Sequence, residues 1–276
     1  MRRNSSTFIL RHLLLTLFLL FTAYPMLWMA LCAFRTEGDA QARPLALPTT
    51  LVLDNMANVL RNGSFGSAYI NSLLLCTASV AVAVTFSALA AFAFAQMSFR
   101  GKNLLFYLFI LGMMIPIHVT LIPLNRLLGS SGLGIKGGLM ALAGPYIGFA
   151  LPVSILILKG AFSSLPKDLL DAARVDGCNS IQVFLHVALP LSRPALATVV
   201  IFNFLTMWNE FSFALTLLGP GVRTLTLALN DFKGEHDIMI TQTSAALLLV
   251  VLPLIVVYVF AQKHIIRGLT AGAVKE

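Results

Sequence analysis

Long apolar stretches separated by short polar segments dominate this chain. A helix needs about 20 residues to cross about 30 Å of hydrocarbon, and six stretches come close to that length or exceed it. They run roughly over Leu13–Ala33, Asn71–Met97, Leu104–Leu124, Gly138–Lys159, Ala195–Leu218 and Thr243–Gln262. The pattern predicts an all-α, polytopic membrane protein with six transmembrane helices.

The spacing of these stretches predicts one continuous membrane domain. We expect residues 1–276 to form a single integral membrane domain with its core at about 71–262, and residues 160–194 to form a loop between the fourth and fifth spans. The first span follows Met1-Arg2-Arg3, a start that signal peptides share. Its apolar run is longer than the usual 7–15 residues and no small-x-small cleavage site follows, so we expect an uncleaved anchor.

Composition supports the membrane assignment. The chain is 58% apolar and 11% charged, whereas soluble domains are about 45–50% apolar and about 25% charged. Its three cysteines, Cys32, Cys76 and Cys178, are far apart, and two of them fall inside apolar runs. Their spacing predicts neither a disulfide framework nor a metal site.

The positions of Lys and Arg orient the spans, because cytoplasmic loops carry an excess of them. With the N-terminus inside, the inner segments hold twelve basic and four acidic residues, which accounts for the whole net charge of +8. Both termini and the 160–194 loop are therefore expected in the cytoplasm. Topology explains the basic charge without a nucleic-acid partner, and no basic stripe interleaved with aromatic residues is present.

The 160–194 loop is the most polar part of the inner side, and its pattern predicts a helix, a bend and a second short helix. Ser163 or Ser164 can cap the first helix, which has Pro166 in its first turn. Gly177 suits the bend, because helix ends often need a residue that tolerates positive φ. The second helix is expected to be capped by Asn179 or Ser180 and to end at Pro190. In the simplest interpretation the loop only returns the chain to the membrane.

The residues of this loop resemble a family signature. Permeases of bacterial ATP-binding-cassette (ABC) importers carry Glu-Ala-Ala, three residues, Gly, nine residues and Ile-x-Leu-Pro. Asp171-Ala172-Ala173, Gly177, Val187, Leu189 and Pro190 fall on this pattern at the full spacing, with Asp171 in place of Glu and Val187 in place of Ile. The resemblance implies that the loop couples the permease to an ATPase. The residues expected to do so are Asp171, Ala172, Ala173, Asp176, Gly177, Val187, Leu189 and Pro190.

Two further segments narrow the resemblance. Trp208-Asn209-Glu210-Phe211 and the tail over residues 262–275 look like the smaller permease of maltose-type carbohydrate importers. The resemblance implies a subunit of the bacterial inner membrane, embedded in lipid and moving a sugar by alternating access. Its expected partners are a second permease, two cytoplasmic ATPase subunits and an extracytoplasmic solute-binding protein. No phosphate-binding loop is present, so the chain is expected to hold no cofactor and no catalytic residue, and ATP to bind the partner subunits.

Three other functions are weighed against this one. A permease for glycerol phosphate esters would share the same architecture. A self-contained secondary transporter would show repeated halves and several ion-coupling acids within the membrane, and neither pattern is visible. An intramembrane hydrolase using Ser130 or Ser131 would need a membrane-embedded His as base. His236 and His264 are expected outside the spans, and His118 in the third predicted span is expected to be a packing residue and not a ligand.

Polar groups within the apolar runs are costly and mark candidate sites. Glu210 is the one acidic residue in the predicted spans, and Asn203 and Asn209 lie on the same predicted helix. These three residues are candidates for a translocation path. Alternatively, Glu210 lies near the outer interface, where it caps a helix or pairs with Arg223.

The charge pattern generates a topology prediction. In single-cysteine labelling of intact cells, positions 178 and 275 should be protected from a membrane-impermeant reagent, whereas positions 43 and 233 should react with it. Reaction at position 178 in intact cells would reverse the assigned orientation.

Overall fold

The computed structural model describes the backbone of residues 5–48, 50–61, 63–231 and 239–273, and the side chains of residues 8–48, 50–61, 64–230 and 239–259. Arg2, Arg3, Lys233, His236 and Lys275 lie outside the described residues, and so do the side chains of the 262–273 tail. Within the described residues the regular secondary structure is helical, and an isolated parallel bridge joins Gly137 and Leu218.

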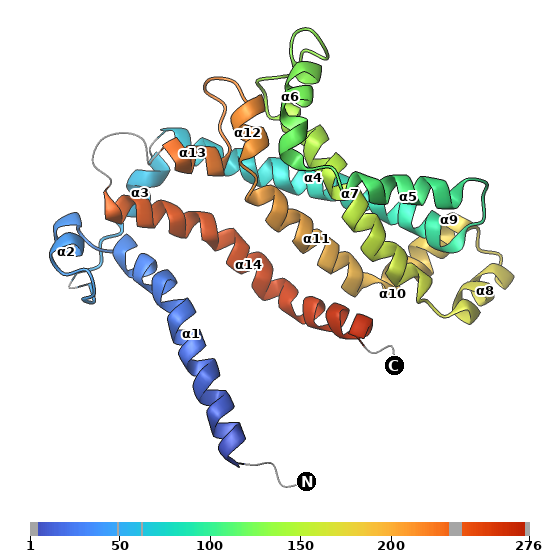
Figure 1. The fold of residues 1–276 in the computed structure, drawn as a ribbon, viewed down its shortest axis with the longest axis horizontal. Helices are drawn as coiled ribbons and strands as arrows, with labels where there is room; N and C mark the ends of the chain where they lie inside the picture. Colours follow the sequence, from blue (N-terminus) through green and yellow to red (C-terminus); the bar gives the residue numbers. More distant parts are fainter. Residues whose placement is uncertain (1–4, 49, 62, 232–238, 274–276) are drawn as a thin grey trace. The chain divides into compact units, whose positions relative to one another are not determined.

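The elements follow one another as helices of very different length (Figure 1). They are α1 (Ser5–Ala33), α2 (Glu37–Ala42), α3 (Asp54–Arg61), α4 (Gly63–Gln96), α5 (Lys102–Gly112), α6 (Ile117–Leu128), α7 (Met140–Ser163), α8 (Lys167–Val175), α9 (Ser180–Val183), the π-helix η1 (Phe184–Ala188), α10 (Leu189–Leu191), α11 (Arg193–Trp208), α12 (Ser212–Leu217), α13 (Leu225–Asp231) and α14 (Ile240–Ala273).

The all-α membrane fold is confirmed. Within the described residues, four helices are long and apolar enough to cross a membrane, over Phe8–Ala33, Ser64–Gln96, Met140–Ser163 and Ile240–Val259. Two bent helix pairs raise the number of spans to six if each pair counts as one.

The third predicted span, Leu104–Leu124, is not one straight helix. α5 ends at Gly112, α6 starts at Ile117, and the two helices bend by 98°. Pro116 supplies the reason, because it has no N–H to continue a helix and restricts the residue before it to extended conformations.

The fifth predicted span, Ala195–Leu218, is also interrupted. α11 ends at Trp208 and α12 begins at Ser212, so Glu210 lies in the break and not within a continuous helix. At its other end α11 meets the segment Ser180–Leu191 at a bend of 79°.

The helices pack into two compact units, which we call the first unit (residues 1–66 and 228–253) and the second unit (residues 67–227 and 254–276). In the first unit Arg35 follows α1 and is 1% exposed. Its Nε donates to Asp39 Oδ2 at 2.7 Å, and its Nη2 donates to the carbonyls of Asp39 and Arg43, each at 2.8 Å. A buried charge needs such pairing, and these bonds fix the turn after α1.

Glu37 ties α2 to the start of α14 within the first unit. Its carboxylate accepts hydrogen bonds from the N–H groups of Ile240 and Thr241, each at 3.0 Å, and from Thr241 Oγ1 at 2.7 Å. Burial raises the pKa of Glu37, but these bonds outweigh it and hold the pKa below its usual value. The position suits an anion, because a helix N-terminus carries partial positive charge.

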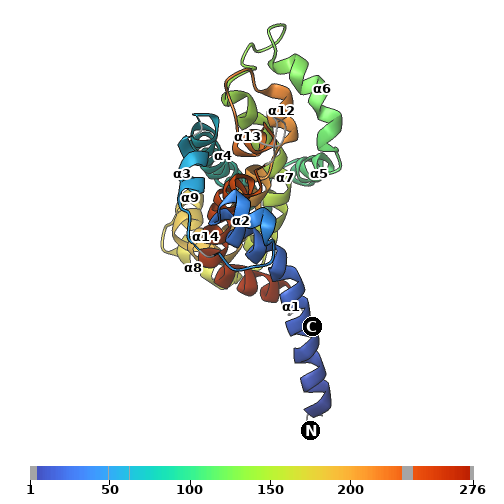
Figure 2. The ribbon, with the colours of Figure 1, turned by 90° about the vertical axis from the view of Figure 1, so that its left-hand side faces the viewer.

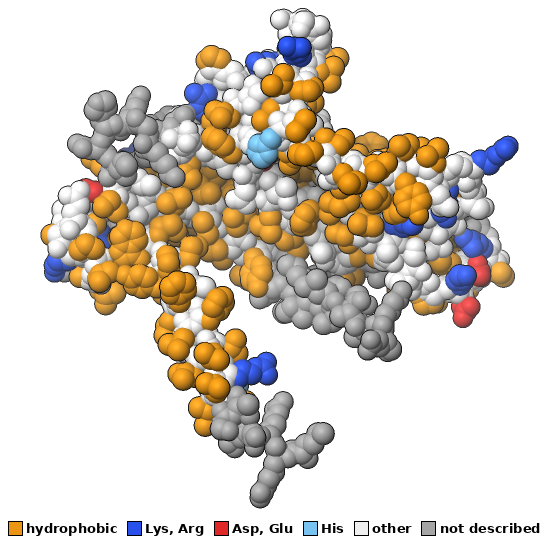
Figure 3. Space-filling view, viewed as in Figure 1, with side chains coloured by type: hydrophobic (Ala, Val, Ile, Leu, Met, Phe, Trp, Pro, Cys, Tyr) orange, Lys and Arg blue, Asp and Glu red, His pale blue; other side chains and the backbone are white. Residues whose placement is uncertain are grey.

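In the second unit α7 packs against α5 and α11, and α12 packs against α6 and α7. α6 and α12 lie side by side at one end of this unit (Figures 1 and 2), whereas α8 and α9 lie at the other end (Figure 1). Charged side chains gather around α8, as Figure 3 shows. The second unit therefore carries the predicted coupling loop at one end.

Candidate functional site

The first helix of the 160–194 loop is α8. The prediction that Ser163 or Ser164 caps it is wrong, because α7 runs to Ser163 and Ser164 ends it, with its Oγ donating to the Ala161 carbonyl at 2.8 Å. Pro166 stands at the cap position of α8. Asp168 in the first turn and Arg174 in the last turn complement the helix dipole.

The bend predicted at Gly177 is confirmed, because its φ is +85°. The N–H of Gly177 donates to the Arg174 carbonyl, and the N–H of Cys178 donates to the Ala173 carbonyl, each at 3.0 Å. A Cβ built on Gly177 would meet no atom within 4 Å. Backbone conformation, and not lack of space, is what favours glycine there.

Asn179 caps the second helix in a reciprocal capping box. The N–H of Gln182 donates to Asn179 Oδ1 at 2.9 Å, and the N–H of Asn179 donates to Gln182 Oε1 at 2.8 Å. Of the two predicted caps, the structure therefore selects Asn179 over Ser180.

The second helix was predicted to end at Pro190 and ends one residue later. It continues through the π-helical turn η1 and α10 to Leu191. Pro190 has no N–H for a regular helical bond; the irregular turn η1 directly precedes it, and the helix ends at the next residue. Single π-helical turns of this kind are frequent at functional sites.

The inner side of the loop packs on the transmembrane helices. Phe184 is 6% exposed, and its ring lies 5.2 Å from that of Phe92 on α4 and 6.2 Å from that of Phe162 on α7. Leu170 and Val183 are buried in the same cluster. Three signature residues, Ala173, Val187 and Leu189, pack against this cluster and are partly buried.

The outer side of the loop is open. Asp171, Ala172, Asp176 and Gly177 are exposed, and Asp171 forms an ion pair of 2.8 Å with Arg174. The same side of the loop also exposes apolar side chains: Val175 is 87% exposed and Ile181 is 68% exposed. The signature residues thus form two sets, one that packs on the apolar cluster and one that is exposed. Pro190 is partly buried but is not among the residues that pack on the cluster.

Sequence reasoning did not identify the inward anchors from outside the loop. Phe92 and Phe162 lie within apolar runs that contain many similar residues, so their sequence context does not distinguish them. Val175 was also missed, although an apolar residue beside Arg174 and Asp176 in a polar loop is a signal that could have found it.

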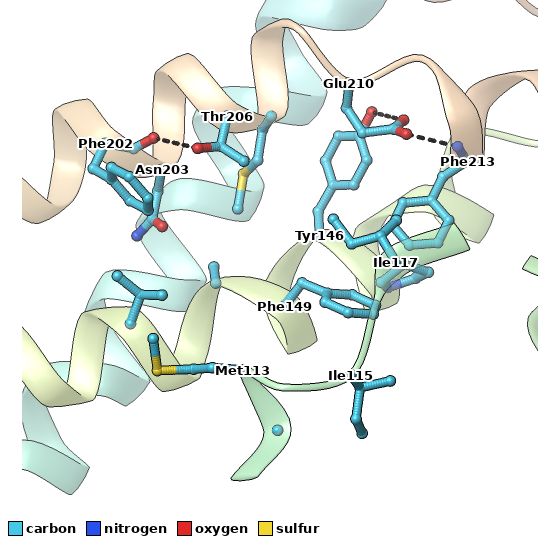
Figure 4. Close-up of a pocket in the computed structure, with 15 residues that line it drawn as sticks. Met113, Ile115, Ile117, Tyr146, Phe149, Phe202, Asn203, Thr206, Glu210 and Phe213 are labelled. Carbon is cyan, nitrogen blue, oxygen red and sulfur yellow. Dashed lines mark hydrogen bonds between the residues drawn. The ribbon is translucent and has the colours of Figure 1, made fainter. Parts of the chain in front are cut away.

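A cavity of about 230 Å³ lies among α5, α7, α11 and the break after α11 (Figure 4). Its wall is mostly apolar and aromatic, with few polar groups, as is usual for ligand sites. The residues labelled in Figure 4 are Met113, Ile115, Ile117, Tyr146, Phe149, Phe202, Asn203, Thr206, Glu210 and Phe213.

Two of the three predicted path residues line this cavity. Asn203 is buried and donates from Nδ2 to Ser154 Oγ at 2.8 Å. Asn209 is not among the lining residues, because it follows the last turn of α11, is exposed, and donates to the Leu205 carbonyl at 2.8 Å.

Glu210 lines the cavity and also caps α12, as the alternative interpretation required. Its Oε1 accepts from the N–H of Phe213 at 2.6 Å, and its Oε2 accepts from the Tyr146 hydroxyl at 3.1 Å and from the N–H of Ala214 at 3.2 Å. Thr226 Oγ1 donates to the Glu210 carbonyl at 2.6 Å. Glu210 therefore joins α7, α12 and α13 beside the cavity.

In the part of the chain that the structure describes, no group of three or more His, Cys, Asp or Glu side chains comes together that could hold a metal ion. The described residues form an apolar helical membrane protein that has a cavity beside its helices and a structured polar loop at one end of the second unit. This combination defines the class of a membrane transport subunit.

Comparison with known proteins identifies the family. Residues 83–271 match the family described as binding-protein-dependent transport system inner membrane component. The chain belongs to this family, and the ABC importer permease resemblance is confirmed. The chain is a permease subunit of an importer in the inner membrane.

The chain is similar to relatives along almost its whole length. It is 40% identical to a putative ABC transporter permease protein, ORF2, of Caldicellulosiruptor sp., over 91% of each chain. It is 31% identical to the diacetylchitobiose uptake system permease protein NgcG of Streptomyces coelicolor, over 95% of this chain and 87% of the relative. It is 34% identical to the alpha-glucoside transport system permease protein AglG of Rhizobium meliloti, over 87% of this chain and 66% of the relative.

A solved structure supports the fold. A chain of a bacterial ABC transporter involved in the import of the acidic polysaccharide alginate superimposes with a TM-score of 0.84. The two chains are 22% identical, and the match covers 96% of this chain and 98% of the other. At this identity the likeness establishes the architecture alone.

The bend at Gly177 generates a mutational prediction. Gly177→Val should reach the membrane in near-normal amounts, because the added side chain meets open space, yet lose transport. A β-branched residue at positive φ is strained by roughly 1–3 kcal/mol, which is enough to reorient the second helix. Gly177→Asn should retain most transport, because Asn tolerates the left-handed region, and Asp171→Ala should reduce transport only mildly.

The measurement is uptake together with substrate-stimulated ATP hydrolysis by the complete importer. Full uptake and stimulation in Gly177→Val would mean that the loop is only a connector. An equal loss in Gly177→Val and Gly177→Asn would mean that side-chain volume, and not φ, is decisive.

Proposed function

We propose that this subunit, together with a second and different permease, forms the pathway by which a carbohydrate or polyol enters the cell. Two cytoplasmic ATPase subunits bind and hydrolyse ATP, and an extracytoplasmic solute-binding protein delivers the substrate. Both termini lie in the cytoplasm, on the side of the coupling loop. Relatives named for diacetylchitobiose, alpha-glucosides and starch degradation products support a sugar as substrate.

The observation that carries the proposal is the division of the coupling loop into two faces. Its outward face combines the exposed apolar side chains of Leu169, Val175 and Ile181 with the Asp171–Arg174 pair. An amphipathic helix of this kind binds in a groove of a partner, where apolar contacts supply affinity and charges select the register. In the importer the groove belongs to an ATPase subunit.

The inward face makes the loop part of the transmembrane body. Because Phe184 packs against both Phe92 and Phe162, displacement of the loop moves the cytoplasmic ends of α4 and α7 with it. α11 leaves the loop through the 79° bend at Ser192. This arrangement suits alternating access, in which rigid bodies rock around a central site.

The substrate path uses the cavity beside α7 and α11. Asn203 and Glu210 supply hydrogen-bonding groups, and the aromatic rings of the wall supply apolar surface for the faces of a sugar. Asn209 is exposed just beyond α11, so it is available to a path that this subunit shares with the second permease.

The packing of Phe184 generates a prediction about coupling. Phe184→Leu should lower sugar uptake several-fold per ATP hydrolysed, because the smaller side chain loosens the contact with α4 and α7. Phe94→Leu is the matched control, since Phe94 is also buried, at 5%, but packs with Phe106 and Phe109 and has no ring contact with Phe184.

Both variants should first be compared for their amounts in the membrane. The ratio of uptake to ATP hydrolysis in proteoliposomes that contain the complete importer is then the decisive quantity. An equal fall of this ratio in both variants would assign Phe184 a packing role only.

Uptake of radiolabelled compounds tests the substrate assignment. Deletion of the gene should abolish binding-protein-dependent uptake of an oligosaccharide or polyol and leave glucose phosphotransfer intact. Loss of glycerol phosphate ester uptake would select the alternative permease type, and loss of amino acid or peptide uptake would contradict the carbohydrate assignment.

A further inference from the structure

Residues 43–48 and 50–53, between α2 and α3 in the first unit, expose four leucines. Leu45, Leu47, Leu51 and Leu53 are 78%, 72%, 74% and 68% exposed. Single exposed leucines are common on protein surfaces, but four within nine positions form an apolar patch that indicates an interaction surface. We call residues 43–48 and 50–53 the leucine segment.

Two hydrogen bonds hold the leucine segment beside the end of α1. Trp28 Nε1 donates to the Pro44 carbonyl at 2.7 Å, and the N–H of Val52 donates to the Phe34 carbonyl at 2.9 Å. After α2 the chain therefore turns back and runs alongside the last turns of α1. Figure 3 shows hydrophobic side chains along α1.

The position of Trp28 along α1 sets the depth of the segment in the membrane. If the hydrocarbon begins at Phe8, Trp28 lies about 30 Å further along the helix, which is the full hydrocarbon thickness. If it begins at Leu13, after Arg11 and His12, Trp28 lies about 22 Å along, or about 8 Å short of the far boundary. Pro44 therefore lies between the boundary and about 8 Å beneath it.

The backbone of the leucine segment is irregular, and irregular backbone exposed to lipid does not occur within the hydrocarbon. Pro44 therefore lies near the hydrocarbon boundary and not about 8 Å beneath it. A Trp side chain is also typical of the membrane interface. The segment is anchored from the protein side as well, since the Arg43 carbonyl accepts from Arg35 Nη2 at 2.8 Å. Asn55 Nδ2 donates to the Ala33 and Arg35 carbonyls at 3.0 and 2.8 Å, which fixes the start of α3.

We propose that the leucine segment is an interfacial membrane anchor. Its backbone lies in the headgroup layer of the outer leaflet, and its leucine side chains enter the acyl chains of the surrounding phospholipids. A soluble binding protein fits this patch poorly, because the patch shares its depth with the end of a membrane span. The assignment to the outer leaflet rests on the topology under the proposed function, whereas the depth follows from α1 alone.

Cysteine accessibility in intact cells provides the first test. Gly38→Cys serves as the control, because Gly38 is exposed on α2 between the acidic Glu37 and Asp39. A membrane-impermeant maleimide should label Gly38→Cys readily and Leu47→Cys at least about tenfold more slowly, since apolar surroundings raise the pKa of a thiol and one unit lowers its thiolate about tenfold. The unsubstituted chain, with its three native cysteines, gives the background.

Equal labelling rates for Leu47→Cys and Gly38→Cys would place the segment in water and overturn the anchor. If Gly38→Cys were labelled only after permeabilisation, the topology would be wrong. The same comparison in permeabilised cells would then test the anchor by itself.

A photoactivatable amino acid at position 47 distinguishes lipid from protein as the occupant. In membranes that contain the whole importer, position 47 should give a phospholipid adduct, as should position 21 on α1, where Phe21 is 80% exposed. Position 175 in the coupling loop should give no lipid adduct. A crosslink from position 47 to the second permease or to the binding protein, or no lipid adduct there while position 21 forms one, would overturn the proposal.

Discussion

The packing of Phe184 against Phe92 and Phe162 is the contact on which the functional architecture depends. These rings belong to the coupling loop, α4 and α7, so three segments far apart in the chain share one apolar cluster. Burial of large aromatic side chains is among the strongest sources of packing energy. Because the inward face of the loop is buried in this cluster, only its outward face is available to bind the ATPase that we propose as its partner.

Breaks in the helices give the second unit its other functional features. The 98° bend between α5 and α6 and the break after Trp208 both interrupt apolar runs, and the 79° bend at Ser192 joins the coupling loop to α11. A break frees backbone groups, which must be satisfied again within an apolar medium. Glu210 meets this need after α11, where its carboxylate caps α12 and accepts from Tyr146. The cavity lies beside this break, so Glu210 and Tyr146, whose polar groups stabilise the break, also line the candidate path.

The first unit uses polar contacts to control the end of a membrane helix. Arg35 and Asn55 gather the carbonyls that follow α1, and Glu37 caps α14. Held in this way, the chain turns back beside α1 and presents the leucine segment at the depth of Trp28. The same turn after α1 thus contains a buried ionic network and presents an exposed apolar surface.

The sequence by itself determined the all-α membrane class, the approximate spans, the bend at Gly177 and a cap at Asn179 or Ser180. Each follows from chemistry within a few neighbouring residues or from average hydrophobicity over one span. Only the tertiary structure decided that Ala173, Val187 and Leu189 face inward while Asp171, Ala172 and Asp176 face outward. It also decided that Asn203 and Glu210 line a cavity from which Asn209 is absent, and that Pro44 returns to Trp28. These outcomes depend on contacts between residues distant in the chain, and in an apolar sequence many side chains are equally suited to make them. Local pattern therefore specifies which segments become helices, whereas packing selects which of their faces meet.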